Sequence, residues 1–166
     1  IQDLLFPAPA LVTVAVDVQD PGNLGTLIRS TEAAGGTGLV AAGHSAHPFG
    51  WKALRGSMGS SLRLPIARAA DTRGALTALR DAGLHLVALA ADAPTSLDDA
   101  DLSGPVAVLA GSEGAGLSTE VAALCDVRVR IPMHAGVESL NVGVAASLVL
   151  FDVARRRRSH QEFARE

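Results

Sequence analysis

The sequence is poor in cysteine and aromatic residues, and each scarcity narrows the class of protein. A single cysteine, Cys125, in 166 residues excludes an intrachain disulfide framework and a multi-cysteine zinc site. Aromatic residues make up 3% of the chain, so the core has to be built from Ala, Val, Leu and Ile. No run approaches the ~18 consecutive apolar residues of a membrane span. What is present, 48% hydrophobic and 19% charged residues, excludes a disordered chain.

The amino terminus carries no basic segment ahead of an apolar run, so no signal peptide is predicted. The chain begins at Ile1, and we expect residues 1–10 to be residual linker from a longer protein. A lone cysteine is typical of a reducing compartment, so we expect a cytoplasmic protein. The lack of a long apolar run predicts that it has no membrane partner.

The net charge of −3 is unevenly distributed. Residues 1–70 and 127–166 carry a small positive excess, whereas residues 71–126 hold nine acidic and two basic side chains. The two ends could therefore meet a polyanion while the middle faces solvent, although such a split also arises by chance.

Short apolar runs alternate with helical periodicity along the chain, which predicts an α/β fold with a parallel sheet flanked by helices. Ligands of such sheets lie beyond the carboxyl ends of the strands, so the loops after Val18, Ala110 and Ile131 are the places to seek chemistry. The predicted strands are residues 11–18, 39–42, 62–66, 85–91, 106–110 and 127–131. The predicted helices are residues 23–34, 47–57, 71–82, 117–124 and 139–157.

The first loop contains Asn23 and Arg29 at the start of a helix. Asparagine is a good helix cap, and Arg29 could simply form an exposed ion pair with Glu32 three residues on. The second loop, Gly-Ser-Glu-Gly-Ala-Gly from Gly111, lets a ligand approach the backbone closely, but its order matches neither a Walker loop nor a dinucleotide fingerprint. Glu113 within it would repel a phosphate.

The third loop leads from Ile131 through Ser139 and Asn141 into a helix that is apolar nearly all round. Such a helix is buried in a core or an interface. Ser139 could cap this helix, and Asn141 could be a satisfied buried amide. A hydrolase triad of Ser139 and His134 with an aspartate is conceivable, but no G-x-S-x-G elbow is present.

The three loops together resemble the motifs of the SpoU (TrmH-type) branch of the SPOUT RNA methyltransferases. The first motif, D-P-x-N-x-G-x-x-x-R, corresponds to Asp20–Arg29, and the second, G-x-E-x-x-G-[LM], to Gly111–Leu117. The third, I-P-M…S-L-N-V, corresponds to Ile131–Val142, and a K-x-x-R-x-S-x-G segment begins at Lys52. The order and spacing make the resemblance specific, and we expect the methyltransferase domain to span residues 11–157 with a basic and polar tail at 158–166.

The resemblance implies transfer of a methyl group from S-adenosyl-L-methionine to a ribose 2′-hydroxyl of RNA. It also implies a SPOUT-type C-terminal trefoil knot and no metal. Catalytic roles would fall to Asn23, Arg29, Glu113, Ser139 and Asn141. The cofactor would meet Leu109, Ala110, Gly111, Gly116, Ile131, Met133, Ser139 and Leu140. RNA would meet Arg29, Lys52, Arg55 and Arg63. Arg29 would be either the general base or a phosphate anchor.

The resemblance further implies a homodimer through the knot helices and, in many relatives, an additional N-terminal RNA-binding domain, which we expect to have preceded the linker at residues 1–10. Ribosomal RNA is favoured over tRNA as the substrate. A non-catalytic RNA-binding module of the same fold is the alternative, disfavoured because all five catalytic-type residues are present. A dinucleotide-dependent oxidoreductase would need G-x-G-x-x-G after the first strand, where this chain has D-P-G-N-L-G.

Overall fold

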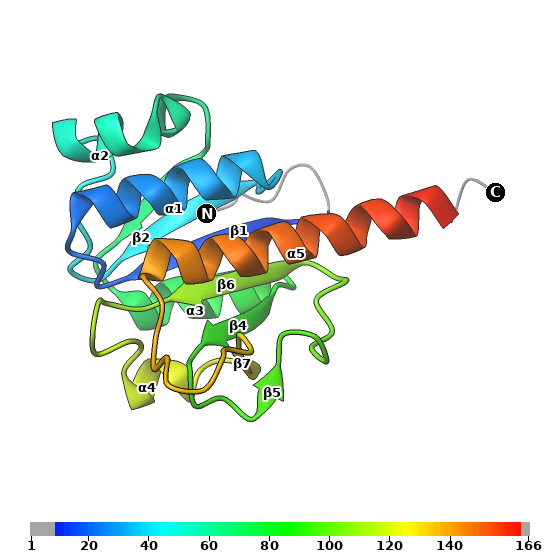
Figure 1. The fold of residues 1–166 in the computed structure, drawn as a ribbon. Coiled ribbons are helices and arrows are strands. Elements are labelled where there is room, and N and C mark those ends of the chain that lie inside the picture. The colour runs from blue at the N-terminus through cyan, green and yellow to red at the C-terminus, as the bar shows by residue number, and fades with distance from the viewer. Residues whose placement is uncertain (1–8, 164–166) are drawn as a thin grey trace.

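The computed structural model describes residues 9–163 as alternating strands and helices (Figure 1). The strands are β1 (Leu11–Val16), β2 (Gly38–Ala42), β3 (Ile66–Ala69), β4 (His85–Leu89), β5 (Thr95–Ser96), β6 (Val106–Ala110) and β7 (Val127–Arg130). The helices are α1 (Pro21–Ala33), α2 (Trp51–Ser57), the short 3-10 helix η2 (Ser60–Leu62), α3 (Thr72–Asp81), α4 (Thr119–Ala122) and α5 (Val142–Phe163).

The seven strands form one sheet in the order β3-β2-β1-β6-β4-β7-β5, and every pair in it is parallel. The predicted parallel sheet is confirmed. Because β1, β6, β4 and β7 are neighbours, the loops that follow their carboxyl ends meet at one edge of the sheet. Loops far apart in sequence are thereby brought together.

Both faces of the sheet are covered, as the apolar strands predict. Along β1, Val12, Val14 and Val16 pack on the side of α3, in a cluster with Leu76 and Leu79. The alternate residues face α1 and α5 on the other side (Figure 1). One of these, Thr13, is fully buried and shares a 2.6 Å hydroxyl hydrogen bond with Thr31 of α1, so its polar group is satisfied.

Several predicted boundaries differ from the structure. The predicted strand at 62–66 is wrong, because η2 occupies its beginning and the paired strand β3 starts only at Ile66. The predicted helix start at Asn23 is wrong by two residues: α1 begins at Pro21, and the Asp20 side chain caps it by accepting from the Asn23 N–H at 2.8 Å. The final helix begins at Val142 instead of residue 139 and continues to Phe163 instead of 157.

Helix α2 packs closely against α1 through glycines. A Cβ on Gly25 of α1 would come within 2.9 Å of the backbone of Gly56 and the carbonyl oxygen of Ala53, both in α2. No side chain separates the two backbones at this contact. Helix α2 is therefore held directly against the helix that carries Asn23 and Arg29.

No helix in the described part of the chain has the length and apolarity to cross a membrane. The predicted linker lies almost wholly outside the described residues, and α5 runs through much of the predicted tail. The domain limits and the trefoil knot stay predictions.

Candidate functional site

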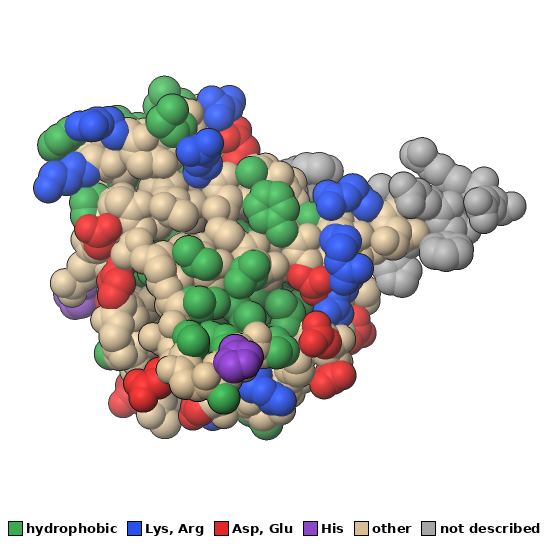
Figure 2. Space-filling view, in the orientation of Figure 1, with side chains coloured by type: hydrophobic (Ala, Val, Ile, Leu, Met, Phe, Trp, Pro, Cys, Tyr) green, Lys and Arg blue, Asp and Glu red, His purple; other side chains and the backbone are tan. Residues whose placement is uncertain are grey.

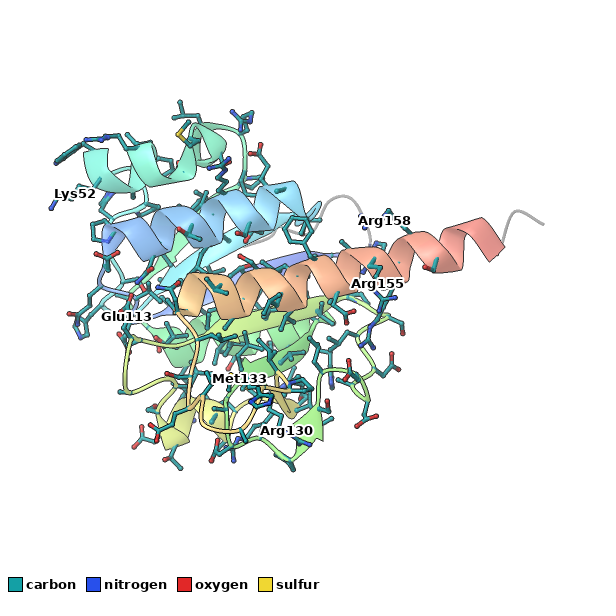
Figure 3. All side chains as sticks on the ribbon, viewed as in Figure 1. Lys52, Glu113, Arg130, Met133, Arg155 and Arg158 are labelled. Carbon is teal, nitrogen blue, oxygen red and sulfur yellow. The ribbon has the colours of Figure 1, made fainter. Side chains whose placement is uncertain are left out.

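A cavity of about 1010 Å³ lies over the carboxyl ends of β4, β6 and β7. Its walls come from two of the three loops singled out by the sequence, those after β6 and β7, and from α4 and the residues that follow β4; none of its lining residues belongs to the first loop. Glu113 and Met133, from the loops after β6 and β7, both lie on the β4 and β7 side of α5 (Figure 3). Most of the lining residues are glycine, alanine or other apolar residues, but about half of the lining surface is polar, so the cavity suits a ligand that has both apolar and polar parts.

The glycine loop after β6 folds back on itself. Ser112 and Gly116 exchange two backbone hydrogen bonds, of 3.1 and 3.0 Å, which close the loop. A Cβ on Gly111 would lie closer than 3.0 Å to the backbone of Gly116 and Leu117, so only glycine fits where the two limbs of the loop meet. Gly116 has a φ of +67°, a conformation that glycine adopts readily.

A chain of side-chain hydrogen bonds joins the three motif loops. The Asn23 amide Nδ2 donates to Glu113 Oε1 at 2.6 Å, and the Asn141 Nδ2 donates to Asn23 Oδ1 at 2.9 Å. Asn141 Oδ1 in turn accepts from the Gly143 N–H at 2.9 Å and so caps the start of α5. Both amide orientations are fixed by their partners, and the Glu113 carboxylate is held at the cavity rim.

The structure places four of the five predicted catalytic residues at this edge. Glu113, Ser139 and Asn141 line the cavity, and Asn23 is bonded to two of them. Ser139 is exposed, and α5 is capped by Asn141 in its stead. His134 contacts the carbonyl of Ala135 beside it, which gives no support to a hydrolase triad.

Seven of the eight predicted cofactor-contacting residues line the cavity. They are Ala110, Gly111, Gly116, Ile131, Met133, Ser139 and Leu140. Leu109 is the exception: it is fully buried within β6 and does not line the cavity. Its contact with a cofactor stays a prediction without support from this geometry.

Sequence reasoning missed the wall formed by residues 88–92, at the carboxyl end of β4. It also missed Arg128 of β7, which lines the cavity and bonds Asp92 at 2.6 Å. This hydrogen bond to the guanidinium lowers the pKa of the Asp92 carboxyl. The sequence signal for this wall was the apolar run that forms β4. That run could not be assigned to the cavity without the strand order, which places β4 between β6 and β7.

Arg29 does not line the cavity. It lies six residues beyond Asn23, which is about 9 Å along the axis of α1. At ~100° per residue it points about 40° from Gly25, which faces α2, and about 60° from Thr26, which lies against Gly143 of α5. The exposed Arg29 side chain therefore occupies the outer face of α1 between α2 and α5.

The other predicted RNA contacts lie on the same side of the molecule as α2. Lys52 and Arg55 are exposed on this helix, and Lys52 lies at its outer end (Figure 3). Arg63 instead makes a two-pronged ion pair with Glu32, with bonds of 2.6 and 2.7 Å that lower the pKa of the Glu32 carboxyl. Glu32 thus pairs with Arg63. It does not pair with Arg29, the partner that the i,i+3 spacing had allowed.

The arginine run at the end of α5 is partly structural. Arg156 donates to the carbonyls of Leu97 and Ala100, and Arg157 donates to those of Pro9 and Gly104. These two arginines hold α5 against the loop between β5 and β6 and against the segment before β1. Among the described residues no three His, Cys, Asp or Glu side chains gather as a metal site would require.

A model of the SpoU rRNA methylase family matches residues 10–151 of the chain. The chain belongs to the SpoU rRNA methylase family. The relatives of this SpoU chain include uncharacterized tRNA/rRNA methyltransferases of Mycobacterium sp. (strain KMS) and Mycobacterium leprae. The first is 45% identical over 152 residues, covering 92% of this chain and 48% of the relative. The second is 43% identical over 160 residues, covering 94% and 52%. The chain thus spans about half the length of these relatives.

Solved structures of methyltransferases share the fold. The SpoU methyltransferase AviRb from Streptomyces viridochromogenes, in complex with AdoMet, has a TM-score of 0.89 and 34% identity, over 96% of this chain and 65% of its own. An RNA 2′-O ribose methyltransferase has a TM-score of 0.81 and 37% identity, over 92% and 58%. An AdoMet-bound rRNA methyltransferase from Sinorhizobium meliloti gives 0.84 and 36%, over 89% and 57%.

Proposed function

We propose that this SpoU-family chain is an S-adenosyl-L-methionine-dependent RNA methyltransferase that modifies a ribose 2′-hydroxyl. The observation that carries the proposal is the hydrogen-bonded chain Glu113–Asn23–Asn141, which joins all three motif loops at the rim of one cavity. One neighbouring structure is described as holding AdoMet and another as a 2′-O ribose methyltransferase, and both exceed 30% identity.

The cavity fits the cofactor by its chemistry. A purine nucleoside without phosphates needs an apolar slot and backbone partners, and the loops around Gly111 and Ile131 offer both. Glu113 at the rim would disfavour a phosphate but tolerate a sulfonium cation. Ala110, Gly111, Gly116, Ile131, Met133, Ser139 and Leu140 would hold the cofactor, which supplies a methyl group activated on a positively charged sulfur.

The residues of the chain would position the acceptor hydroxyl and manage its proton. The Asn23 and Glu113 side chains, fixed to each other, provide a rigid polar edge against which a ribose can be aligned. Proton removal is the difficult part, because a ribose hydroxyl is a very weak acid. Arg29 stands on the exposed side of the same helix, so we assign it to the RNA, with Lys52 and Arg55 farther out.

Ribosomal RNA is the substrate that we favour over tRNA. The matching family is described as rRNA methylases, and a neighbour described as an rRNA methyltransferase is 36% identical. A neighbour described in connection with 2-OH methylation of C/U34 on tRNA is 25% identical. A cytoplasmic location stays a prediction.

Calorimetry and mapping of modified nucleotides test the proposed function. S-adenosylmethionine or S-adenosylhomocysteine should bind the chain without RNA, and cells carrying the gene should contain a 2′-O-methylated nucleotide that is missing after its deletion. Binding heat with NADH, and none with S-adenosylmethionine or S-adenosylhomocysteine, would contradict the proposed methyltransferase function. RNA binding without any cofactor heat would favour the non-catalytic module.

We further propose a homodimer through α5. Val144, Leu148 and Phe151 recur at i, i+4 and i+7 on this helix and are each 46–47% exposed. Hydrophobic side chains gather over the face of the molecule that α5 crosses (Figure 2). A stripe of this kind on a monomer is typical of an association surface.

Leu148→Asp is expected to shift the chain from dimer to monomer, because it places a charge in the middle of the apolar stripe. Sedimentation velocity measures the change. The matched control is Leu62→Asp, which adds the same charge at a leucine that is 77% exposed on η2. A wild-type chain that sediments as a monomer, or an L148D variant that remains dimeric, would contradict this arrangement.

A further inference from the structure

Helix α2 presents an exposed apolar and basic surface that the proposed catalytic site does not use. Trp51, Lys52, Leu54, Arg55, Gly56 and Met58 line a shallow hollow of about 620 Å³, and we name these six residues the α2 platform. Trp51 is 62% exposed and Met58 is 69% exposed, although the chain has only one tryptophan and two methionines. These two large apolar side chains are therefore not there to fill the core of the described protomer.

The polar groups of the platform are exclusively positive. The Arg55 guanidinium carbon lies 5.3 Å from the centre of the Trp51 ring, a cation–π contact that holds the ring and the cation together. The sequence contains no Asp or Glu between Glu32 and Asp71, and this stretch has four basic residues. Figure 2 shows Lys and Arg side chains on both sides of the hydrophobic atoms on this projection.

Met58 lies at the end of α2 and contributes a second large apolar side chain to the platform. Met58 ends α2 in the left-handed conformation, with a φ of 49°, where glycine would fit without strain. The chain nevertheless carries a long apolar side chain there, pointed into solvent. The left-handed conformation is a common way for a helix to end, so the notable feature is the exposed side chain, which extends the apolar part of the platform beyond Trp51.

The platform is also fixed relative to the catalytic edge. At the glycine contact the backbones of α1 and α2 touch directly, so no side chain between them can change conformation and shift α2. Helix α1 carries both Asn23 at the cavity rim and Arg29 on the outer face. An RNA strand bound at Arg29 therefore also reaches the α2 platform, because both lie on the same side of α1.

We propose that the α2 platform stacks an unpaired base of the RNA, one that flanks the nucleotide to be methylated. The base would lie on the Trp51 ring and the Met58 side chain, while Lys52 and Arg55 neutralise the neighbouring phosphates. Aromatic rings interleaved with cations and free of carboxylates are typical of single-strand binding, and they favour RNA over a protein partner. The proposal rests on the proposed function and adds that the RNA is single-stranded at this point.

The lone tryptophan allows a direct test. A single-stranded oligouridylate should quench the emission of Trp51, and a blunt RNA duplex of the same length should quench it much less, because its internal bases are already stacked. Equal quenching by both, or none by either, would overturn the stacking of an unpaired base.

Variants separate stacking from charge. Trp51→Ala should weaken binding of the single strand by about 5- to 100-fold, the range for loss of one stacked base, whereas Trp51→Phe should retain most of the affinity. Arg73→Ala on α3 is the matched control for Arg55→Ala: both remove one exposed arginine, and only R55A should weaken binding strongly. Cofactor binding should be unchanged in all four variants.

The two proposals can fail separately. If Trp51→Ala binds RNA like the wild type while a ribose is still methylated, the platform inference is wrong and the proposed function stands. If the platform variants lose RNA but no ribose methylation is found with the wild-type chain, the proposed function is wrong and single-strand binding stands.

Discussion

Replacing Arg29 with alanine is expected to reduce methyl transfer by about 100-fold or more, because an RNA that is no longer held at Arg29 presents its ribose out of line, and a small misplacement can cost that much. Thermal stability should change by less than about 0.5 kcal/mol, because the side chain is exposed and no described residue forms a hydrogen bond or ion pair with it. Affinity for the cofactor should also persist, since Arg29 does not line the cavity. Single-turnover rates with saturating RNA measure the effect.

Arg29→Lys distinguishes the two roles that Arg29 could have. Lysine keeps the positive charge but lacks the planar, two-pronged donor of arginine. Recovery of much of the activity in R29K would assign Arg29 to a phosphate, the role that its place between α2 and α5 supports. A rate as low as that of the alanine variant would assign it to geometry or proton chemistry. Near-normal single-turnover rates for R29A would remove it from the catalytic residues.

Gly111→Ala is expected to weaken cofactor binding by about 5- to 150-fold. The added Cβ meets backbone atoms of Gly116 and Leu117, which cannot rotate away as a flexible side chain would. Overpacking of this kind costs about 1–3 kcal/mol, and the loop can relieve it only by opening the Ser112–Gly116 bridge at the cavity wall. Calorimetry with S-adenosylhomocysteine measures the loss.

Gly104→Ala is the matched control for this glycine. It lies in the loop before the same strand, β6, and a Cβ there would have nothing within 4 Å. Its affinity should equal that of the wild type. If G111A and G104A bind the cofactor equally well, the closed glycine loop is not needed to form the pocket.

The strands β1, β2, β4, β6 and β7 and the three informative loops were predictable because each carries a local signal, whereas β3 was misplaced and the two-residue strand β5 was not predicted. Uniformly apolar runs predicted a parallel sheet, and the motif loops follow β1, β6 and β7 as expected. That the first and second motif loops lie side by side was not predictable. The hydrogen bond from Asn23 to Glu113 depends on β1 lying beside β6, and local periodicity does not determine the order of the strands.

Other misses have similar physical causes. Residues 62–66 read as a strand because Leu62, Leu64 and Ile66 alternate, yet the exposed Leu62 belongs to η2. Competition between Arg29 and Arg63 for Glu32 was decided by tertiary geometry, which places Arg63, the residue directly after η2, opposite α1. Local spacing favoured the helical neighbour instead.

The hydrogen-bonded chain at the cavity rim joins residues that are 90 and 118 positions apart in the sequence. During synthesis, Asn23 leaves the ribosome long before Glu113, and Asn141 appears only when the last helix is being made. Contacts over such separations form late, after the costly closure of long loops. The order of translation therefore makes the rim one of the last parts of the protein to assemble, and a nascent chain that stops short of α5 lacks both a finished binding site and the helix that covers one face of the sheet.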